Sequence, residues 1–199
     1  MKYFIPVIKR ICLFGLLNVL FINSDILSQT VITKELKGFR GYNWGISLDY
    51  VKSTETKSYL QSFHGFGIDA LSYKGDIAGL TARIDYSFKD GKLFEGTYTI
   101  NPEDEIKSSF NKLEKYLIDE FGKPNFRSGR LINSDSIWVK VNDYDKYKGP
   151  ELFWKFSKGF IGLIASKFED DITITVLYSK NNSIEEYGQD RIISTDDYK

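Results

Sequence analysis

The sequence predicts an α+β protein, a two-layer sandwich in which two main helices pack on one face of an antiparallel β-sheet of about six to seven strands. Three observations lead to this prediction. Apolar and polar residues alternate over several short segments, a tight-turn dipeptide joins two of these segments, and two other segments favour helices. The expected order is one helix, three strands, a second helix and four strands (α-βββ-α-ββββ).

We expect the first helix to run from Leu48 to about Leu60. Ser47 suits the N-cap position, where its hydroxyl accepts a free backbone N–H group. Asp49 lies in the first turn, where the helix dipole favours negative charge. The preceding residues 30–37 alternate only weakly, so they suit an edge strand or a flexible lead.

The next three segments have the patterns of strands. Residues 70–74 form a short strand that ends at a glycine. Residues 80–88 alternate between apolar and polar side chains, which is typical of a half-buried strand. Asp90 and Gly91 supply the positive φ angles of a tight turn, so residues 92–100 should return as the second strand of a hairpin.

The alternation assigns the side chains of this hairpin to two faces. Ile84 and Tyr86 should be buried under the second helix. Arg83, Asp85 and Thr97 should lie on the opposite face, which is open to solvent or to a partner.

The second helix should begin near Asn101, which suits the N-cap, with Pro102 at the first helical position. Residues 106–117 place apolar side chains at steps of three and four, which gives one apolar stripe. Gly122 and Pro124 should end the helix. Further strands are expected within residues 137–141, 152–156, 160–168 and 172–178.

The first residues have the organisation of a secretory signal peptide. Lys2, Lys9 and Arg10 form a positive n-region, the apolar run from Ile11 to Ile22 follows, and residues 24–29 are polar and small. The apolar run is shorter than the roughly 18 residues that a membrane-spanning helix needs. We therefore expect export and cleavage, with no stable membrane insertion afterwards.

This gives three parts: a signal peptide at 1–29, a single α+β domain at 30–179, and a polar, disordered tail at 180–199. Cys12 is the only cysteine and lies inside the apolar run, so it cannot serve as a lipid-attachment residue after that run. The expected location is therefore periplasmic or extracellular, without a lipid anchor.

Composition excludes several functions for the mature chain. Lys and Arg total 27 and Asp and Glu total 27, and such a balance argues against nucleic acid and against a polybasic membrane surface. Loss of Cys12 with the signal leaves no disulfide, no thiolate metal site and no cysteine nucleophile. His64 is the only histidine and lies in the turn-like segment 62–67, so we expect a structural residue in a loop. No metal and no cofactor are predicted.

Two short motifs resemble small exported envelope proteins. Gly45–Val51 is similar to the G-x-[ST]-x-x-x-V entry to the first helix of outer-membrane assembly lipoproteins of the BamE/SmpA type and of the related β-lactamase-inhibitor-protein fold. Residues 121–124 resemble the L-G-x-P that closes their helical portion, although here the two motifs lie far apart in the sequence. The resemblance implies a helix-on-sheet binding scaffold in the cell envelope, with no catalytic residues.

The densest acidic cluster before the tail is Glu103, Asp104 and Glu105, which a helix start explains through its dipole. Residues 142–145 superficially resemble the start of a calcium loop, but the required glycine and glutamate are misplaced, which favours a surface turn. No catalytic residue is predicted.

Aromatic residues are abundant, with 13 Tyr, 15 Phe and 3 Trp. Most fall at strand positions that face a core. Those in loops or on alternate faces form a candidate interaction surface, because Tyr and Trp are favoured at recognition sites. These residues are Tyr42, Trp44, Trp138, Tyr144 and Tyr147.

Export and the lack of a complete catalytic motif favour a non-catalytic binding or assembly module of the bacterial cell envelope. Its partner would be an envelope protein or a surface ligand. Two alternatives stay open. One is a hydrolase of envelope polysaccharide that uses two carboxylates, which would have to converge in a cleft. The other is a proteinaceous inhibitor of a secreted enzyme, by analogy of fold alone.

Overall fold

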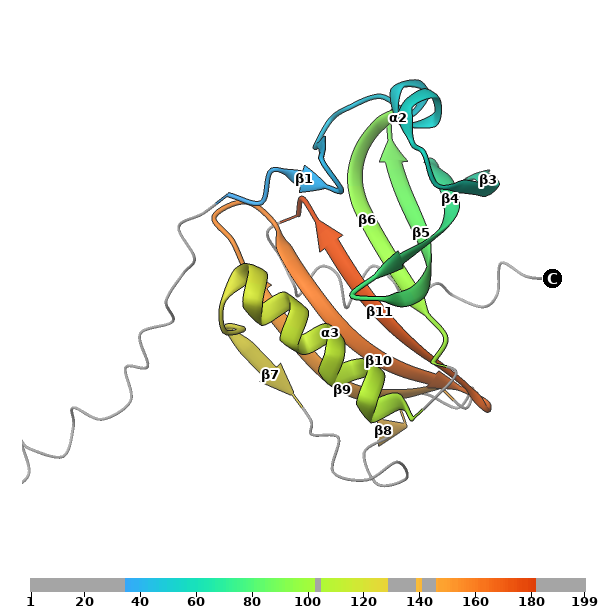
Figure 1. Cartoon of the computed structure of the whole chain (residues 1–199). Coiled ribbons are helices and arrows are strands. Elements are labelled where there is room, and N and C mark those ends of the chain that lie inside the picture. The colour runs from blue at the N-terminus through green and yellow to red at the C-terminus, as the bar shows by residue number, and fades with distance from the viewer. Residues whose placement is uncertain (1–34, 103–104, 129–138, 141–145, 182–199) are drawn as a thin grey trace, which may run out of the picture. The chain divides into compact units, whose positions relative to one another are not determined.

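The computed structural model describes residues 35–102, 105–128, 139–140 and 146–181. The chain divides into two units, Met1–Thr30 and Val31–Lys199, and all described residues belong to the second. That unit has the predicted α+β character, because an antiparallel sheet dominates it and two helices accompany the sheet (Figure 1).

The described part of the chain contains two helices and eleven strands. They are β1 (Gly38–Phe39), β2 (Tyr42–Asn43), α2 (Leu48–Thr54), β3 (Ser58–Gly65), β4 (Ile68–Ile77), β5 (Leu80–Lys89), β6 (Lys92–Ile100), α3 (Ile106–Phe121), β7 (Phe126–Ser128), β8 (Val139–Lys140), β9 (Lys146–Lys155), β10 (Phe160–Phe168) and β11 (Asp171–Ser179).

The main sheet has nine strands in the order β3-β4-β5-β6-β11-β10-β9-β7, with β8 also paired to β9. β1 and β2 form a separate two-stranded ladder. The expected count of six to seven strands and the order α-βββ-α-ββββ are therefore wrong. The additional strands carry no alternation that a sequence pattern could reveal: β3 is exposed along nearly its whole length, and β7 has only three residues.

The first helix is shorter than expected. Ser47 caps α2 as predicted and accepts the backbone N–H of Tyr50, but the helix ends at Thr54 and does not reach Leu60. At the C-cap, the Glu55 carboxylate accepts the backbone N–H groups of the next two residues, which turns the chain away from the helix. Residues 58–65 continue as β3, so the predicted extension to Leu60 is wrong.

The β5–β6 hairpin confirms the predicted faces. Ile84 and Tyr86 are fully buried, whereas Arg83 is exposed and Asp85 and Thr97 are partly exposed. The cover over Tyr86 differs from the prediction. Its ring packs against Phe39 and Tyr42 of β1 and β2, so this end of the sheet is covered by the chain before α2, not by the second helix. The neighbouring strand β4 is longer than the expected 70–74, since it runs from Ile68 to Ile77, whereas β6 has the expected bounds.

The second helix, α3, begins at Ile106, later than the predicted start at Asn101. Its N-cap is Glu105, and β6 continues to Ile100 because that residue pairs with Ile174 of β11. The predicted apolar stripe is confirmed: Ile106, Phe110, Leu113 and Leu117 are buried. Gly122 ends the helix with a φ of 80°, a region that favours glycine. Figure 1 shows α3 crossing strands β9 to β11.

The last two strands follow the prediction closely, but β9 begins at Lys146, six residues before the expected strand at 152–156. β10 covers the expected range and β11 starts one residue earlier than expected, while only two residues of the expected strand at 137–141 are described as β8. A second small cluster of Phe153, Phe160 and Leu177 is buried apart from the main core. Neither described helix is long and apolar enough to cross a membrane.

Candidate interaction site

The candidate surface residues Tyr42 and Trp44 lie in a segment that we call the N-terminal strap, residues 36–55. The Trp44 Nε1 donates to the Leu36 carbonyl at 2.7 Å. The Tyr42 ring packs edge-on against Tyr50 and Tyr86. Both Tyr42 and Trp44 are partly buried and pack against the main core. The Trp44 indole thus links two parts of the strap, and both rings help to hold the strap against the core.

The other three candidate residues cannot be placed in the same way. Trp138 and Tyr144 lie outside the described residues. Tyr147 belongs to the backbone of β9, but its side chain is outside the description. A shared surface of all five residues therefore stays a prediction.

Beneath the strap lies a buried polar cluster that the sequence analysis missed. Arg40 donates from Nε to the Tyr86 hydroxyl at 2.9 Å and from Nη1 to the Tyr98 hydroxyl at 3.3 Å. The Tyr86 hydroxyl donates to the Glu55 carboxylate, which also lies 3.5 Å from Arg40 Nε. The Glu55 side chain is only 4% exposed. These four side chains link the strap to β5 and β6.

The surroundings of Glu55 and Tyr86 determine the protonation state of each group. Burial favours the neutral form of Glu55, but the Tyr86 hydroxyl, two backbone N–H groups and Arg40 stabilise the carboxylate more, so the pKa of Glu55 lies below its usual range. Burial and the bond to Glu55 raise the pKa of Tyr86 far above its usual range. At neutral pH, Glu55 is thus ionised and Tyr86 keeps its proton. Neither group is poised to transfer a proton.

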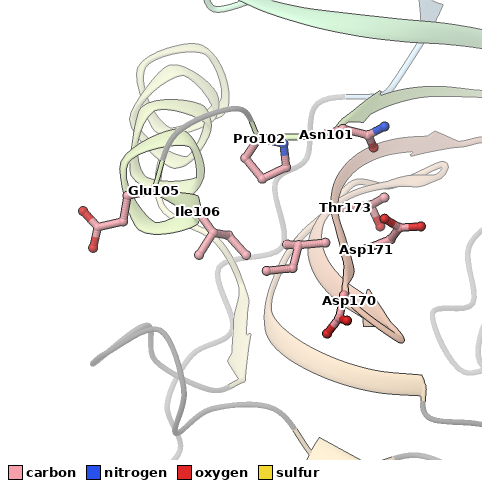
Figure 2. A pocket seen from close by; sticks show the side chains of 8 residues that line it. Asn101, Pro102, Glu105, Ile106, Asp170, Asp171 and Thr173 are labelled. Atoms are coloured by element: carbon pink, nitrogen blue, oxygen red, sulfur yellow. The ribbon is translucent and has the colours of Figure 1, made fainter.

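A cleft of about 560 Å³ opens between the start of α3 and the turn that joins β10 to β11. Its lining includes the carboxylates of Glu105, Asp170 and Asp171. Figure 2 shows Glu105 on the helix side pointing away from Asp170 and Asp171, which lie across the cleft. The predicted acidic cluster contributes only Glu105, since Glu103 and Asp104 lie outside the described residues.

Metal binding has no candidate site in the described part of the chain. No three His, Cys, Asp or Glu side chains gather there in a way that could hold a metal ion.

The clearest exposed feature is strand β3, which forms one end of the sheet. Four apolar side chains on β3 and the following turn are about half exposed or more: Tyr59 at 50%, Leu60 at 49%, Phe63 at 52% and Phe66 at 76%. β4 pairs with one side of β3, and no strand of the described chain pairs with its other side. An unpaired edge presents a row of backbone donors and acceptors to any extended chain.

The two ends of the sheet differ in how they are protected. At the far end, β7 and β8 have three and two residues, and Arg127 of β7 forms an ion pair with Glu114 of α3. Short strands and charges are the usual protection of a sheet edge. β3 has eight residues and no Asp, Glu, Lys, Arg or Pro. It is the less protected of the two edges.

His64 lies on this strand, so the expectation of a loop residue is wrong. The turn comes two residues later, at Phe66 and Gly67, which both have positive φ angles. The His64 side chain is 85% exposed and its Nδ1 contacts the carboxylate of Asp69 on β4. The aromatic, uncharged composition of residues 58–66 was the available signal for this strand. It was hidden because both faces of β3 are exposed, which removes the usual alternation.

Comparisons of the chain with protein-family models, with curated proteins and with solved structures find no match.

Proposed function

We propose that this chain is an exported, non-catalytic binding or assembly module of the bacterial cell envelope, and that β3 is its binding edge. The observation that carries the proposal is the exposed strand β3 at the end of the sheet, which has no lysine, arginine or acidic residue and bears exposed apolar side chains. In strand addition, backbone hydrogen bonds supply affinity and exposed side chains supply selectivity. The four exposed apolar side chains on and beside β3 can serve the second role.

The interior supports a binding scaffold. The Glu55 carboxylate, whose side chain is 4% exposed, is held by Arg40, Tyr86 and backbone N–H groups. The proposal includes a two-layer arrangement with both helices on one face of the sheet, as in the envelope proteins that the helix-entry motif resembles. Such a scaffold fixes β3 to a rigid sheet.

The signal-like leader supports export without a lipid anchor. Intact-mass analysis of the protein from its native host tests this part. We expect a mature chain that begins close to Thr30. Retention of the first 25 or so residues, or an added acyl mass, would contradict export in this form.

A competition between two matched variants tests the binding edge. Phe63 on β3 and Phe168 on β10 are both 52% exposed, so lysine at either position adds one charge at equal exposure. Phe63→Lys should reduce the amount of envelope protein captured by the immobilised chain at least tenfold, whereas Phe168→Lys should leave it unchanged. Equal capture by the two variants would show that β3 is not the binding edge.

The second candidate function is a hydrolase of envelope polysaccharide, which needs two acids that converge in a cleft, one to protonate the leaving group and the other to assist water or attack the sugar. The cleft carries Glu105 on one side and Asp170 and Asp171 on the other, but Glu105 points away from them (Figure 2), so the described geometry does not favour this function over the first. This function requires that the wild type releases reducing sugar from envelope polysaccharide and that the double variant Glu105→Gln with Asp171→Asn does not. Inhibition of a secreted enzyme has no supporting contact in the described residues and rests on the analogy of fold.

A further inference from the structure

We infer that residues 182–199 cover the face of the main sheet that lies opposite to the main core, and that Ile184 and Tyr187 pack on its apolar cluster. We call this face the outer face. Residues 182–199 lie outside the described residues and directly follow Asn181. The inference goes beyond the proposed function, because it names the occupant of a second surface of the sheet.

The outer face carries a small apolar cluster that is shielded from water. Successive side chains of a strand point to opposite faces, so Leu177 points away from Tyr178, which belongs to the main core. Leu177 forms the outer cluster with Phe153 and Phe160, and both Leu177 and Phe160 are 0% exposed. Side chains on an uncovered face of an antiparallel sheet keep contact with water. A covering segment is therefore required.

The described residues do not supply an apolar cover for this cluster. Among them, Ile164 of β10 packs on the cluster as a partly buried residue, and Phe126 of β7 packs against Phe153. Both belong to strands of the same sheet, so they lie beside the cluster and not above it. The apolar side chains of α3 that are buried belong to the main core instead.

Burial on the outer face is greatest near the end of β11. Ser179 pairs with Phe160 on one side and with Glu95 on the other. Ser179 is 1% exposed and Glu95 is 4% exposed. Farther along the same strands, the paired residues Thr175 and Ile164 are only partly buried. The cover therefore lies over the end of the sheet at which β11 ends.

The chain turns toward the outer face as it leaves β11. The Ser179 side chain lies on the outer face, because Ser179 follows Leu177 by two positions. Its Oγ accepts the backbone N–H of Asn181 at 3.2 Å. Residues 182–184 span about 10 Å when extended, which exceeds the roughly 7 Å between Leu177 and Ser179 along the strand. Ile184, the first apolar residue of this segment, can therefore reach the cluster.

The other segments outside the described residues start from less suitable places. Residues 129–138 leave β7 at Ser128, which lies opposite Glu151. Glu151 pairs with Ile164, where the outer face is only partly buried. Residues 141–145 enter β9 at its first residue, still farther from the cluster. The signal-like leader is removed from the exported chain that we expect.

This cover has a consequence for binding. An exposed apolar cluster attracts partners or promotes aggregation. Residues 182–199 keep this cluster closed, so a partner can use it only by displacing them. The sequence-based expectation of a disordered tail and this inference exclude each other, and two experiments on the full chain decide between them.

The first experiment compares two matched variants of neighbouring residues. Ile184→Asp places a charge against the apolar cluster and should lower the thermal midpoint by about 4 °C or more, because it displaces the cover from Phe160 and Leu177. Ser183→Asp adds the same charge one position earlier and should leave the midpoint unchanged.

The second experiment locates the segment with a spin label. Because Cys12 is the only cysteine and lies in the leader, Gln189→Cys introduces a single thiol into the exported chain. A nitroxide on this thiol should broaden the amide signals of β6, β10 and β11 near Glu95, Phe160 and Leu177 more than those of α3. The same sample with the nitroxide reduced provides the reference.

Either of two results overturns the inference: equal thermal midpoints for Ile184→Asp and Ser183→Asp, or a label that leaves the signals of β6, β10 and β11 unchanged. If Ile184→Asp does not fold, the label alone decides. Capture of an envelope protein through β3 is measured separately with Phe63→Lys. The inference can therefore fail while the proposed function stands, and the reverse result is equally distinct.

Discussion

At the scale of single residues, the buried contact of Arg40, Glu55 and Tyr86 explains why α2 ends where it does. Each charged group is satisfied by the other and by the tyrosine hydroxyl. A buried pair of this kind contributes little net stability, but removal of one partner is costly because it leaves the other charge unpaired. Substitutions in this cluster therefore test the placement of the strap.

Glu55→Gln should destabilise the fold by about 2 to 3 kcal/mol, because it leaves the Arg40 guanidinium without its counter-ion. The wild type should also lose this contribution in acid. The folded-state pKa of Glu55 is lowered, so its contribution is fully present above the ordinary value of about 4.3 and falls as the pH drops through the folded pKa. Urea midpoints measured from pH 7 to about pH 3 check this.

The matched control is Glu120→Gln, which changes an exposed carboxylate on α3. Its midpoints should follow those of the wild type at each pH. A Glu55→Gln variant with the wild-type acid dependence would contradict the ion pair.

Two tyrosines of the same core give a second comparison at this scale. The Tyr86 hydroxyl bonds both Arg40 and Glu55, whereas the Tyr73 hydroxyl is buried and has no hydrogen-bond partner in the described structure. Tyr86→Phe should cost about 1 to 3 kcal/mol, and Tyr73→Phe should be neutral or stabilising. The free energies of unfolding of the two variants measure these costs. A larger cost for Tyr73→Phe than for Tyr86→Phe would show that the Tyr73 hydroxyl has a partner.

At the scale of elements, one close contact between β1 and β6 fixes the position of the strap. The Phe39 ring of β1 lies over Gly96 of β6, where an added Cβ would be only 2.0 Å from the ring. Glycine is required there because no side chain fits between strand and ring. The rings of Tyr86, Tyr98 and Tyr178 surround Phe39 and leave it little room to move away.

Gly96→Ala should therefore displace the strap and cost about 1 to 3 kcal/mol. Hydrogen exchange of the Trp44 amide, which donates to the Lys37 carbonyl at 3.0 Å, should accelerate relative to the amides of α3. Gly91→Ala is a control with no atom within 4 Å of the added Cβ, although its φ of 69° carries a strain of its own. Equal acceleration in the strap for both variants would contradict the role of Gly96.

The faces of β5 and β6 give another prediction. Ile84→Asp introduces an unpaired charge at a position with 0% exposure and should cost several kcal/mol, a large part of a domain's stability. Thr97→Ala removes a partly exposed hydroxyl and should cost less than about 1 kcal/mol. Urea midpoints of the two variants measure both costs, and the reverse order would mean that the faces are inverted.

At the scale of the whole molecule, the sequence predicts those elements that have a regular spacing of apolar residues or a characteristic turn. The β5–β6 hairpin, the apolar stripe of α3 and the β10–β11 pair all follow from alternation, from Asp90 and Gly91, or from helical spacing. The strap and β3 do not follow, because their places depend on distant contacts. Phe39 is fixed by Gly96, and Glu55 by Arg40 and Tyr86. The exposed β3 has no buried face to produce a pattern.

The same contrast applies to function. Loop aromatics predicted an interaction surface, which stays a prediction, and two of them, Tyr42 and Trp44, also make contacts within and beneath the strap. Exposed aromatics also lie on β3 and its turn, where an edge strand combines them with backbone groups that no described strand pairs with. A candidate site of this type is recognised only when the strand order is known.

The most direct test of the binding edge is hydrogen exchange of the β3 amides, measured for the free chain and again after it has captured an envelope protein. Strand addition predicts that amides within Ser58–Gly65 that exchange rapidly in the free chain become protected, while those of β7 do not change. Unchanged exchange on β3, with new protection elsewhere, would contradict the account.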